Sequence, residues 1–178
     1  ARNLLERGIS IRSLKLDEYE RIVLKKELQL LTGKPVIYVA NVDEDSIQGN
    51  ELTRELEASI RDEECELILV SAALESQFAE LDEEDRALFL EEYGLHETGL
   101  NQLIRASYHL LDLITFFTAG EKEVRAWTIS RGGRAPQAAG TIHSDFEKGF
   151  IRAEVIKFED YMKYKTEAAC REAGKLAV

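Results

Sequence analysis

Val36-Ile-Tyr-Val-Ala40 is the stretch of this sequence that decides its fold class. It is short, apolar and rich in β-branched residues, which is typical of a strand buried on both faces of a parallel sheet. Leu67-Ile-Leu-Val70 has the same character, and Glu51–Arg61, between the two, has apolar residues at helical spacing. A strand–helix–strand order requires a right-handed parallel crossover. We therefore predict an open α/β sheet with helices in this part of the chain.

The rest of the first half is predicted to be helical. The predicted helices are Ala1–Gly8, Leu16–Leu31, a stretch that follows Ser71, Asp82–Tyr93 and a helix that begins at Thr98. Ala1–Gly8 resembles the last turns of a helix that ends at a glycine, and no initiator Met precedes it. We therefore expect an internal piece of a longer protein.

The second half is predicted to be a small α+β domain. The predicted order is a hairpin of Leu113–Phe117 and Val124–Ile129, a helix over Ala135–His143, a strand over Phe150–Phe158, and short helices over Glu159–Tyr164 and Thr166–Gly174. The expected core, left partly open, consists of Phe116, Val124, Trp127, Ile151 and Val155.

Composition narrows the classes of function. The chain has 178 residues, 44% of them hydrophobic, which is enough apolar side chain for a folded core. We find neither a basic-then-apolar leader, which would indicate a signal peptide, nor an apolar run of about 20 residues, which would indicate a membrane span. Cys65 and Cys170 are far apart in sequence and lack the spacing of a metal or disulfide scaffold, so we expect a reducing cytoplasm and no metal site.

Charge is distributed unevenly along the chain, whose net charge is −11. Residues 1–110 contain 12 basic and 24 acidic side chains, whereas residues 111–178 contain 11 and 10. The acidic total argues against general DNA coating. Any contact with nucleic acid is therefore expected in the second half.

Polar segments follow both predicted strands at the edge where α/β sheets bind ligands. Asn41-Val-Asp-Glu44 follows the first strand and Ser71-Ala-Ala-Leu-Glu75 the second, at the spacing of the two base-recognition loops of P-loop GTPases. The candidate base-binding residues are Asn41, Val42, Glu44, Ser71, Ala72 and Ala73. Asn41 either ties the base loop to its neighbours or is a turn residue. Glu44 either reads the base or caps the next helix. Ser71 is expected to shape the loop, and the N–H groups of Ala72 and Ala73 are expected to face the base.

Three segments resemble the Obg-like ATPase (YchF-type) family of P-loop GTPase-like proteins, and they are colinear with it: Lys34–Asp45, Phe117–Thr128 and Ala135–Ile156. The resemblance implies an α/β fold, a partial P-loop NTPase parallel sheet with helices, followed by a small α+β β-grasp (TGS-like) domain. Residues 1–16 would end a coiled-coil insertion, 17–80 would be the C-terminal part of the nucleotide-binding domain, 81–110 a helical connection and 111–178 an incomplete TGS domain.

The resemblance implies part of a ribosome-associated P-loop ATPase in the cytoplasm that uses ATP with Mg²⁺ and prefers ATP over GTP. The Gly-rich phosphate-binding loop is absent from this sequence, so the chain alone is expected to be inactive and to bind no nucleotide firmly. RNA or ribosome contact is expected through the TGS-like half, with no DNA or membrane partner. The candidate contact residues are Lys122, Arg125, Arg131, Arg134, Lys148 and Arg152. The alternative is a regulatory RNA-, ribosome- or protein-binding module without chemistry of its own.

Overall fold

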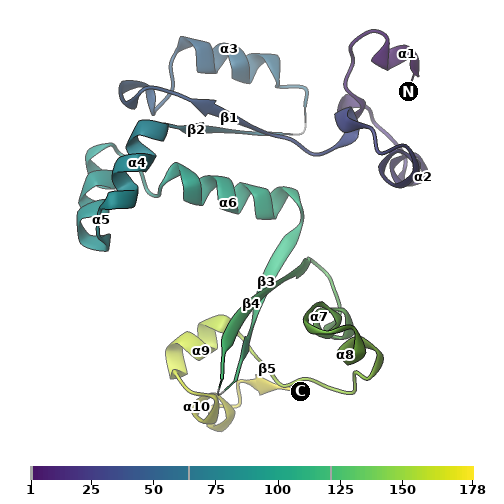
Figure 1. Ribbon diagram of the computed structural model, residues 1–178, viewed down its shortest axis with the longest axis vertical. Helices are drawn as coiled ribbons and strands as arrows, with labels where there is room; N and C mark the ends of the chain where they lie inside the picture. Colours follow the sequence, from purple (N-terminus) through teal and green to yellow (C-terminus); the bar gives the residue numbers. More distant parts are fainter. Residues whose placement is uncertain (1, 64, 121) are drawn as a thin grey trace. The chain divides into compact units, whose positions relative to one another are not determined.

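A computed structural model describes residues 2–63, 65–120 and 122–178 (Figure 1). Ala1 and Glu121, which fall in the predicted first helix and the predicted hairpin turn, lie outside these ranges. The chain divides into two compact units, one ending at Asp112 and the other spanning Leu113–Val178. None of the helices in the described ranges is both long enough and apolar enough to span a membrane.

The first unit contains a parallel pair of strands, β1 (Ile37–Asn41) and β2 (Glu66–Val70), as the sequence predicts. Tyr38 pairs with Leu67 and Asn41 with Val70, so both strands end at the same edge. The helices of this unit are α1 (Arg2–Leu5), α2 (Glu18–Ile22), α3 (Glu51–Ser59), α4 (Ala72–Glu80), α5 (Glu83–Glu92) and α6 (Gly99–Leu110). In Figure 1, α3 and α6 lie on opposite sides of the strand pair.

The core of the first unit includes a cluster from β2, α4 and α6, in addition to Ile11 and Ile60. Its buried side chains include Ile68, Leu74, Phe78 and Ala106. The prediction that the first strand is buried on both faces is wrong, since Val39 is 47% exposed. A strand side chain is buried by what covers its face of the sheet, and the face that carries Val39 is only partly covered by the described residues.

The predicted helix Leu16–Leu31 is broken into shorter pieces. Asp17 caps α2 by accepting from the Glu20 N–H at 2.8 Å, and the Glu20 carboxylate accepts from the Asp17 N–H. A π-helical segment, Val23–Leu28, follows and ends at Gln29, whose backbone is left-handed with φ of 45°. A left-handed residue cannot continue a right-handed helix, so the apolar periodicity extends past the point where the helix stops. The predicted caps of α5 and α6 are confirmed, since Asp82 and Thr98 each accept a backbone N–H of the first turn.

A partly buried ion pair holds the N-terminal segment against the strands. Arg12 Nε lies 2.8 Å from Glu63 Oε2, and the Tyr38 hydroxyl donates to the same oxygen at 3.1 Å. Arg12 Nη1 also donates to the carbonyl of Lys34 at 3.2 Å. The Arg12 and Glu63 side chains are only 18% and 21% exposed, so removing one partner leaves the other desolvated without its countercharge.

We expect Arg12→Ala to lower the free energy of unfolding by about 1–3 kcal/mol, because Glu63 would keep its desolvation cost. Arg2→Ala is the matched control. It removes an ion pair with Glu6 that is 90% and 59% exposed, for which a loss of no more than about 0.5 kcal/mol is expected. Urea unfolding followed by circular dichroism measures both, and equal losses would show that the buried pair is not special.

The second unit begins with the predicted hairpin. β3 (Leu113–Ala119) and β4 (Val124–Ser130) are antiparallel, with Phe116 opposite Trp127. The other elements are α7 (Ala135–Ile142), α8 (Ser144–Lys148), β5 (Val155–Ile156), α9 (Phe158–Tyr164), α10 (Glu167–Glu172) and β6 (Leu176–Ala177), and β6 pairs antiparallel with β5. Asp112, just before β3, has a left-handed backbone with φ of 51°.

Two expectations for this unit are wrong. The strand predicted over Phe150–Phe158 is reduced to Val155–Ile156, because the preceding residues pair with no strand in the described ranges. Ile151 is therefore 90% exposed instead of part of a core, and two other residues of the expected core, Val124 and Val155, are 71% and 55% exposed. The helix α8 was not predicted; His143 Nδ1 accepts from the Asp145 N–H at its start.

Candidate functional site

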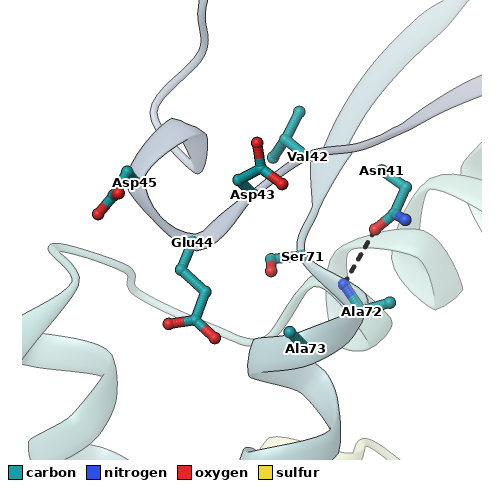
Figure 2. A pocket seen from close by; sticks show the side chains of 8 residues that line it. All are labelled: Asn41, Val42, Asp43, Glu44, Asp45, Ser71, Ala72 and Ala73. Carbon is teal, nitrogen blue, oxygen red and sulfur yellow. Dashed lines mark hydrogen bonds between the residues drawn. The ribbon is translucent and has the colours of Figure 1, made fainter.

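A cavity of about 420 Å³ lies at the carboxyl ends of β1 and β2 (Figure 2). Its lining residues come from the two loops singled out by the sequence: Asn41, Val42, Asp43, Glu44, Asp45, Ser71, Ala72 and Ala73. The volume lies within the range of pockets that bind small ligands. All six candidate base-binding residues are thus brought together at one edge of the sheet.

A side-chain hydrogen bond joins the two loops. Asn41 Oδ1 accepts from the backbone N–H of Ala72 at 3.0 Å, which is the dashed line in Figure 2. The Val42 N–H also donates to the carbonyl of Val70 at 2.8 Å. The expected tie through Asn41 is therefore present, and it fixes the separation of the two walls of the cavity.

The same bond changes what the second loop can offer to a ligand. The Ala72 N–H, which was expected to face a base, is already engaged by Asn41. The Ala73 N–H, one residue further into α4, has no hydrogen-bond partner among the described residues. The Ala73 N–H is therefore the group of this loop that can donate a hydrogen bond to a ligand.

Ser71 fixes the conformation of this loop through a buried side chain. Its side chain is 1% exposed, and its Oγ accepts from the Leu74 N–H at 3.5 Å as the N-cap of α4. Its carbonyl also accepts the Glu75 N–H at 2.9 Å. A buried hydroxyl that accepts from its own helix has little freedom to turn toward a ligand, so Ser71 is a scaffold for Ala72 and Ala73.

Glu44 lies on the opposite wall and does not cap the next helix. It begins a short 3₁₀ turn, Glu44–Ser46, and Asn50 caps α3 in a reciprocal pair with Thr53. The Glu44 side chain instead extends toward α4 (Figure 2). Its Oε1 accepts from Gln77 Nε2, in the second turn of that helix, at 3.2 Å. Of the two roles left open by the sequence, the capping role therefore belongs to Asn50.

Acidic side chains give this edge of the sheet a negative field. Asp43, Glu44 and Asp45 all line the cavity. Burial first, and then the charges of Glu44, Glu92 and Asp45, raise the pKa of the nearby Tyr93 hydroxyl above its usual range. A cavity of this kind suits a ligand edge that donates hydrogen bonds, such as an amino group.

A carboxylate of α4 fixes the helix behind the cavity. Glu75 accepts from the backbone N–H groups of Gly99 at 2.6 Å and Leu100 at 3.2 Å, the first two residues of α6. Gly99 lies so close to β2 that an added Cβ would be 2.9 Å from Val70 Cγ2. The end of β2, the start of α4 and the start of α6 are therefore held together directly beneath the cavity floor.

The candidate RNA-contact residues of the second unit do not form one patch. Lys122 lies in the hairpin turn, whereas Arg131 and Arg134 follow the far end of β4, which a seven-residue strand places about 20 Å or more away. Lys148 ends α8, and Arg152 lies in the exposed segment before β5. The Arg125 side chain is held by a cation–π contact, since its guanidinium lies 4.2 Å from the centroid of the Trp127 ring.

Gln77 is the site residue that sequence reasoning missed. It lies four residues after Ala73 on α4, and residues four apart share a face of a helix. That spacing was a usable signal, because Ala73 was already expected to line the cavity. Its partner Glu44 could not be identified in this way, since 33 residues separate the two in sequence.

The chain resembles proteins of one family over nearly its whole length. Residues 113–178 match the family YchF-GTPase_C, which is described as a protein of unknown function (DUF933). The Ribosome-binding ATPase YchF of Bacillus subtilis (strain 168) is 51% identical over 93% of this chain and 46% of its own length. The protein of the same name from Escherichia coli O157:H7 is 50% identical over 97% of this chain and 47% of its own. The chain thus spans about half the length of these curated relatives.

A solved structure has a similar fold. It is titled "Structure of the Schizosaccharomyces pombe YchF GTPase", and it matches with a TM-score of 0.82 and 38% sequence identity. The match covers 98% of this chain and 47% of that chain. The names of these proteins differ in the nucleotide that they state, which is ATP for the two bacterial proteins and GTP for the third.

Proposed function

The chain belongs to the YchF family over the span that it shares with these relatives, and on this premise we propose that it supplies the base-recognition and docking part of a cytoplasmic, ribosome-associated ATPase. The observation that carries the proposal is the cavity between Asn41–Asp45 and Ser71–Ala73, whose walls Asn41 ties together. The term "complete protein" denotes this chain together with a phosphate-binding segment.

The proposed base is adenine. Guanine presents two donors on one edge, N1–H and the 2-amino group, and a short carboxylate accepts both in a bidentate pair. The carboxylate here is Glu44, one methylene longer than Asp, and Val42 has neither the aliphatic stem nor the charge that a Lys would place beside the base. Adenine requires only one acceptor for its 6-amino group, which the Glu44 carboxylate would supply.

Phosphate and Mg²⁺ binding are assigned to the rest of the complete protein. Mg²⁺ in nucleotide sites is held by phosphate oxygens and one or two carboxylates, and no group of three metal-ligating side chains occurs in the described parts of this chain. We assign no residue of this chain to Mg²⁺. Mg²⁺ would neutralise charge on the phosphates, whereas Asn41, Glu44 and the Ala73 N–H would position the base.

We expect this chain alone not to hydrolyse ATP, because a base pocket without a phosphate cradle stabilises none of the charge that develops on the transferred phosphoryl group. Phosphate release by the purified chain, with and without Mg²⁺, measures this. The complete protein is the positive control, and Mg²⁺-dependent turnover by the chain alone would contradict the assignment.

We propose that the second unit contacts the ribosome or RNA and that it binds neither DNA nor membranes. Arg125 supports this, because a guanidinium stacked on Trp127 is a planar cation held in place for a phosphate or a base. The relatives from Bacillus subtilis and Escherichia coli carry ribosome binding in their names. A protein surface is the alternative partner.

We expect Arg125→Ala to weaken co-sedimentation of the chain with ribosomes and to lower the slope of log affinity against log salt by about 1, the value for one lost phosphate contact. Arg171→Ala is the control, since Arg171 is already paired with Glu154 and Glu167. If neither variant changes binding, the docking surface lies elsewhere. If both variants lower it equally, general charge and not Arg125 is responsible.

A further inference from the structure

We propose that Gln77 is a positioning residue that sets base specificity by holding one oxygen of the Glu44 carboxylate. The inference rests on the proposed function, because it assumes that the cavity binds a purine base. It goes beyond that function by assigning discrimination against guanine to a residue outside the two base-recognition loops.

The supporting geometry is a bridge between the two walls of the cavity. Glu44 belongs to the loop after β1, and Gln77 lies on the helix that follows β2. Gln77 Nε2 lies 3.2 Å from Glu44 Oε1, and the Glu44 side chain is directed toward α4 and not along its own loop (Figure 2). Glu44 as a residue is half-buried, whereas Gln77 is exposed and the bond between them lies at the surface, so the orientation of the carboxylate depends on this bond.

The chemical consequence follows from the number of donors on each base. A bidentate pair with guanine requires both carboxylate oxygens to face the base. The bond to Gln77 occupies one of the two lone pairs of Oε1 and holds the plane of the carboxylate, so in the proposed arrangement Oε2 is the oxygen presented to the base. Adenine loses nothing by this, since its 6-amino group needs one acceptor. Gln77 thereby lowers the affinity for guanine, although it neither contacts the nucleotide nor blocks the base sterically.

The test is equilibrium binding of ATP, GTP and ITP to the complete protein with Gln77→Leu, which keeps a side chain of similar bulk but removes the donor. We expect the affinity for GTP to rise relative to ATP by roughly 3- to 10-fold, the effect of one additional hydrogen bond. The ratio of ITP to ATP should not change, because hypoxanthine has the N1–H but lacks the 2-amino group. Gln77→Lys restores a donor and should restore the original ratios.

Gln48→Leu is the matched control, since Gln48 Nε2 donates to the carbonyl of Tyr93 at 3.2 Å and holds the same loop without touching Glu44. A change of the same size in this control, or an equal gain for GTP and ITP, would show that general order of the loop is responsible and would overturn the inference. Unchanged ratios in Gln77→Leu, with ATP still preferred, would overturn it and leave the proposed function intact. A wild-type protein without any preference for ATP would overturn both.

Discussion

Exchanging Val42 for Lys and Glu44 for Asp together should shift the preference of the complete protein toward GTP by roughly 10- to 100-fold. The Asp carboxylate is too short to reach Gln77, so both of its oxygens would be free for the two donors of guanine. The Lys would add an aliphatic stem beside the base and a positive charge beside Asp43 and Asp45. Both changes act in the wall of the cavity that is tied to Ala72 by Asn41, so the geometry of the second loop should persist.

Equilibrium binding of ATP and GTP to both proteins measures this shift. Asp43→Asn with Asp45→Asn is the matched control, because these exposed carboxylates line the same cavity but contact neither Gln77 nor the second loop in the described structure. An unchanged ratio in the first variant would mean that these side chains do not select the base. A shift of equal size in the control would assign selection to net charge instead.

Phe78→Ala should lower the free energy of unfolding of the first unit by about 3–5 kcal/mol, through lost burial and the cavity that the ring leaves. Phe78 is 2% exposed, and its ring meets that of Phe89 edge to face at 6.0 Å. A small domain has a net stability of about 5–15 kcal/mol, so this one change removes a large part of it. Because α4 also carries Ala73 and Gln77, the cavity should lose its second wall as the helix loosens.

Leu88→Ala is the control, since Leu88 lies on α5 and is 66% exposed, and a change within about 0.5 kcal/mol is expected. Two units can unfold in separate transitions, so amide hydrogen exchange over residues 66–80 measures the effect better than a signal from the whole chain. Equal loss of protection in both variants would show that α4 is not anchored by Phe78.

The strand pair and the two loops that line the cavity could be predicted because they depend on neighbours in sequence. An apolar run indicates a strand, and two parallel strands place Asn41 and Ser71 at one edge. Features that depend on a distant partner could not be predicted. Arg12 pairs with Glu63, 51 residues away, and among 34 acidic side chains no pattern distinguishes that one.

The alternating and the helical patterns of apolar residues each led to one wrong prediction. Phe150–Phe158 alternates, but alternation produces a face only where a neighbouring strand forms the pleat, and Ile151 has none within the described residues. Leu16–Leu31 keeps its helical spacing through Gln29, whose left-handed backbone ends the helix. Apolar spacing reports which residues favour burial, and it contains no information on where the backbone turns.

The left-handed backbone of Asp112 limits how the junction between the two units can vary in evolution. With φ of 51°, this residue stands between the end of α6 and the first residue of β3. Asn and Gly adopt this conformation readily, whereas β-branched residues are strained there. Orthologues should therefore substitute Asp112 by Asn or Gly and exclude Val, Ile and Thr. The junction would be inherited as a backbone conformation, even where the side chains on either side of it have diverged.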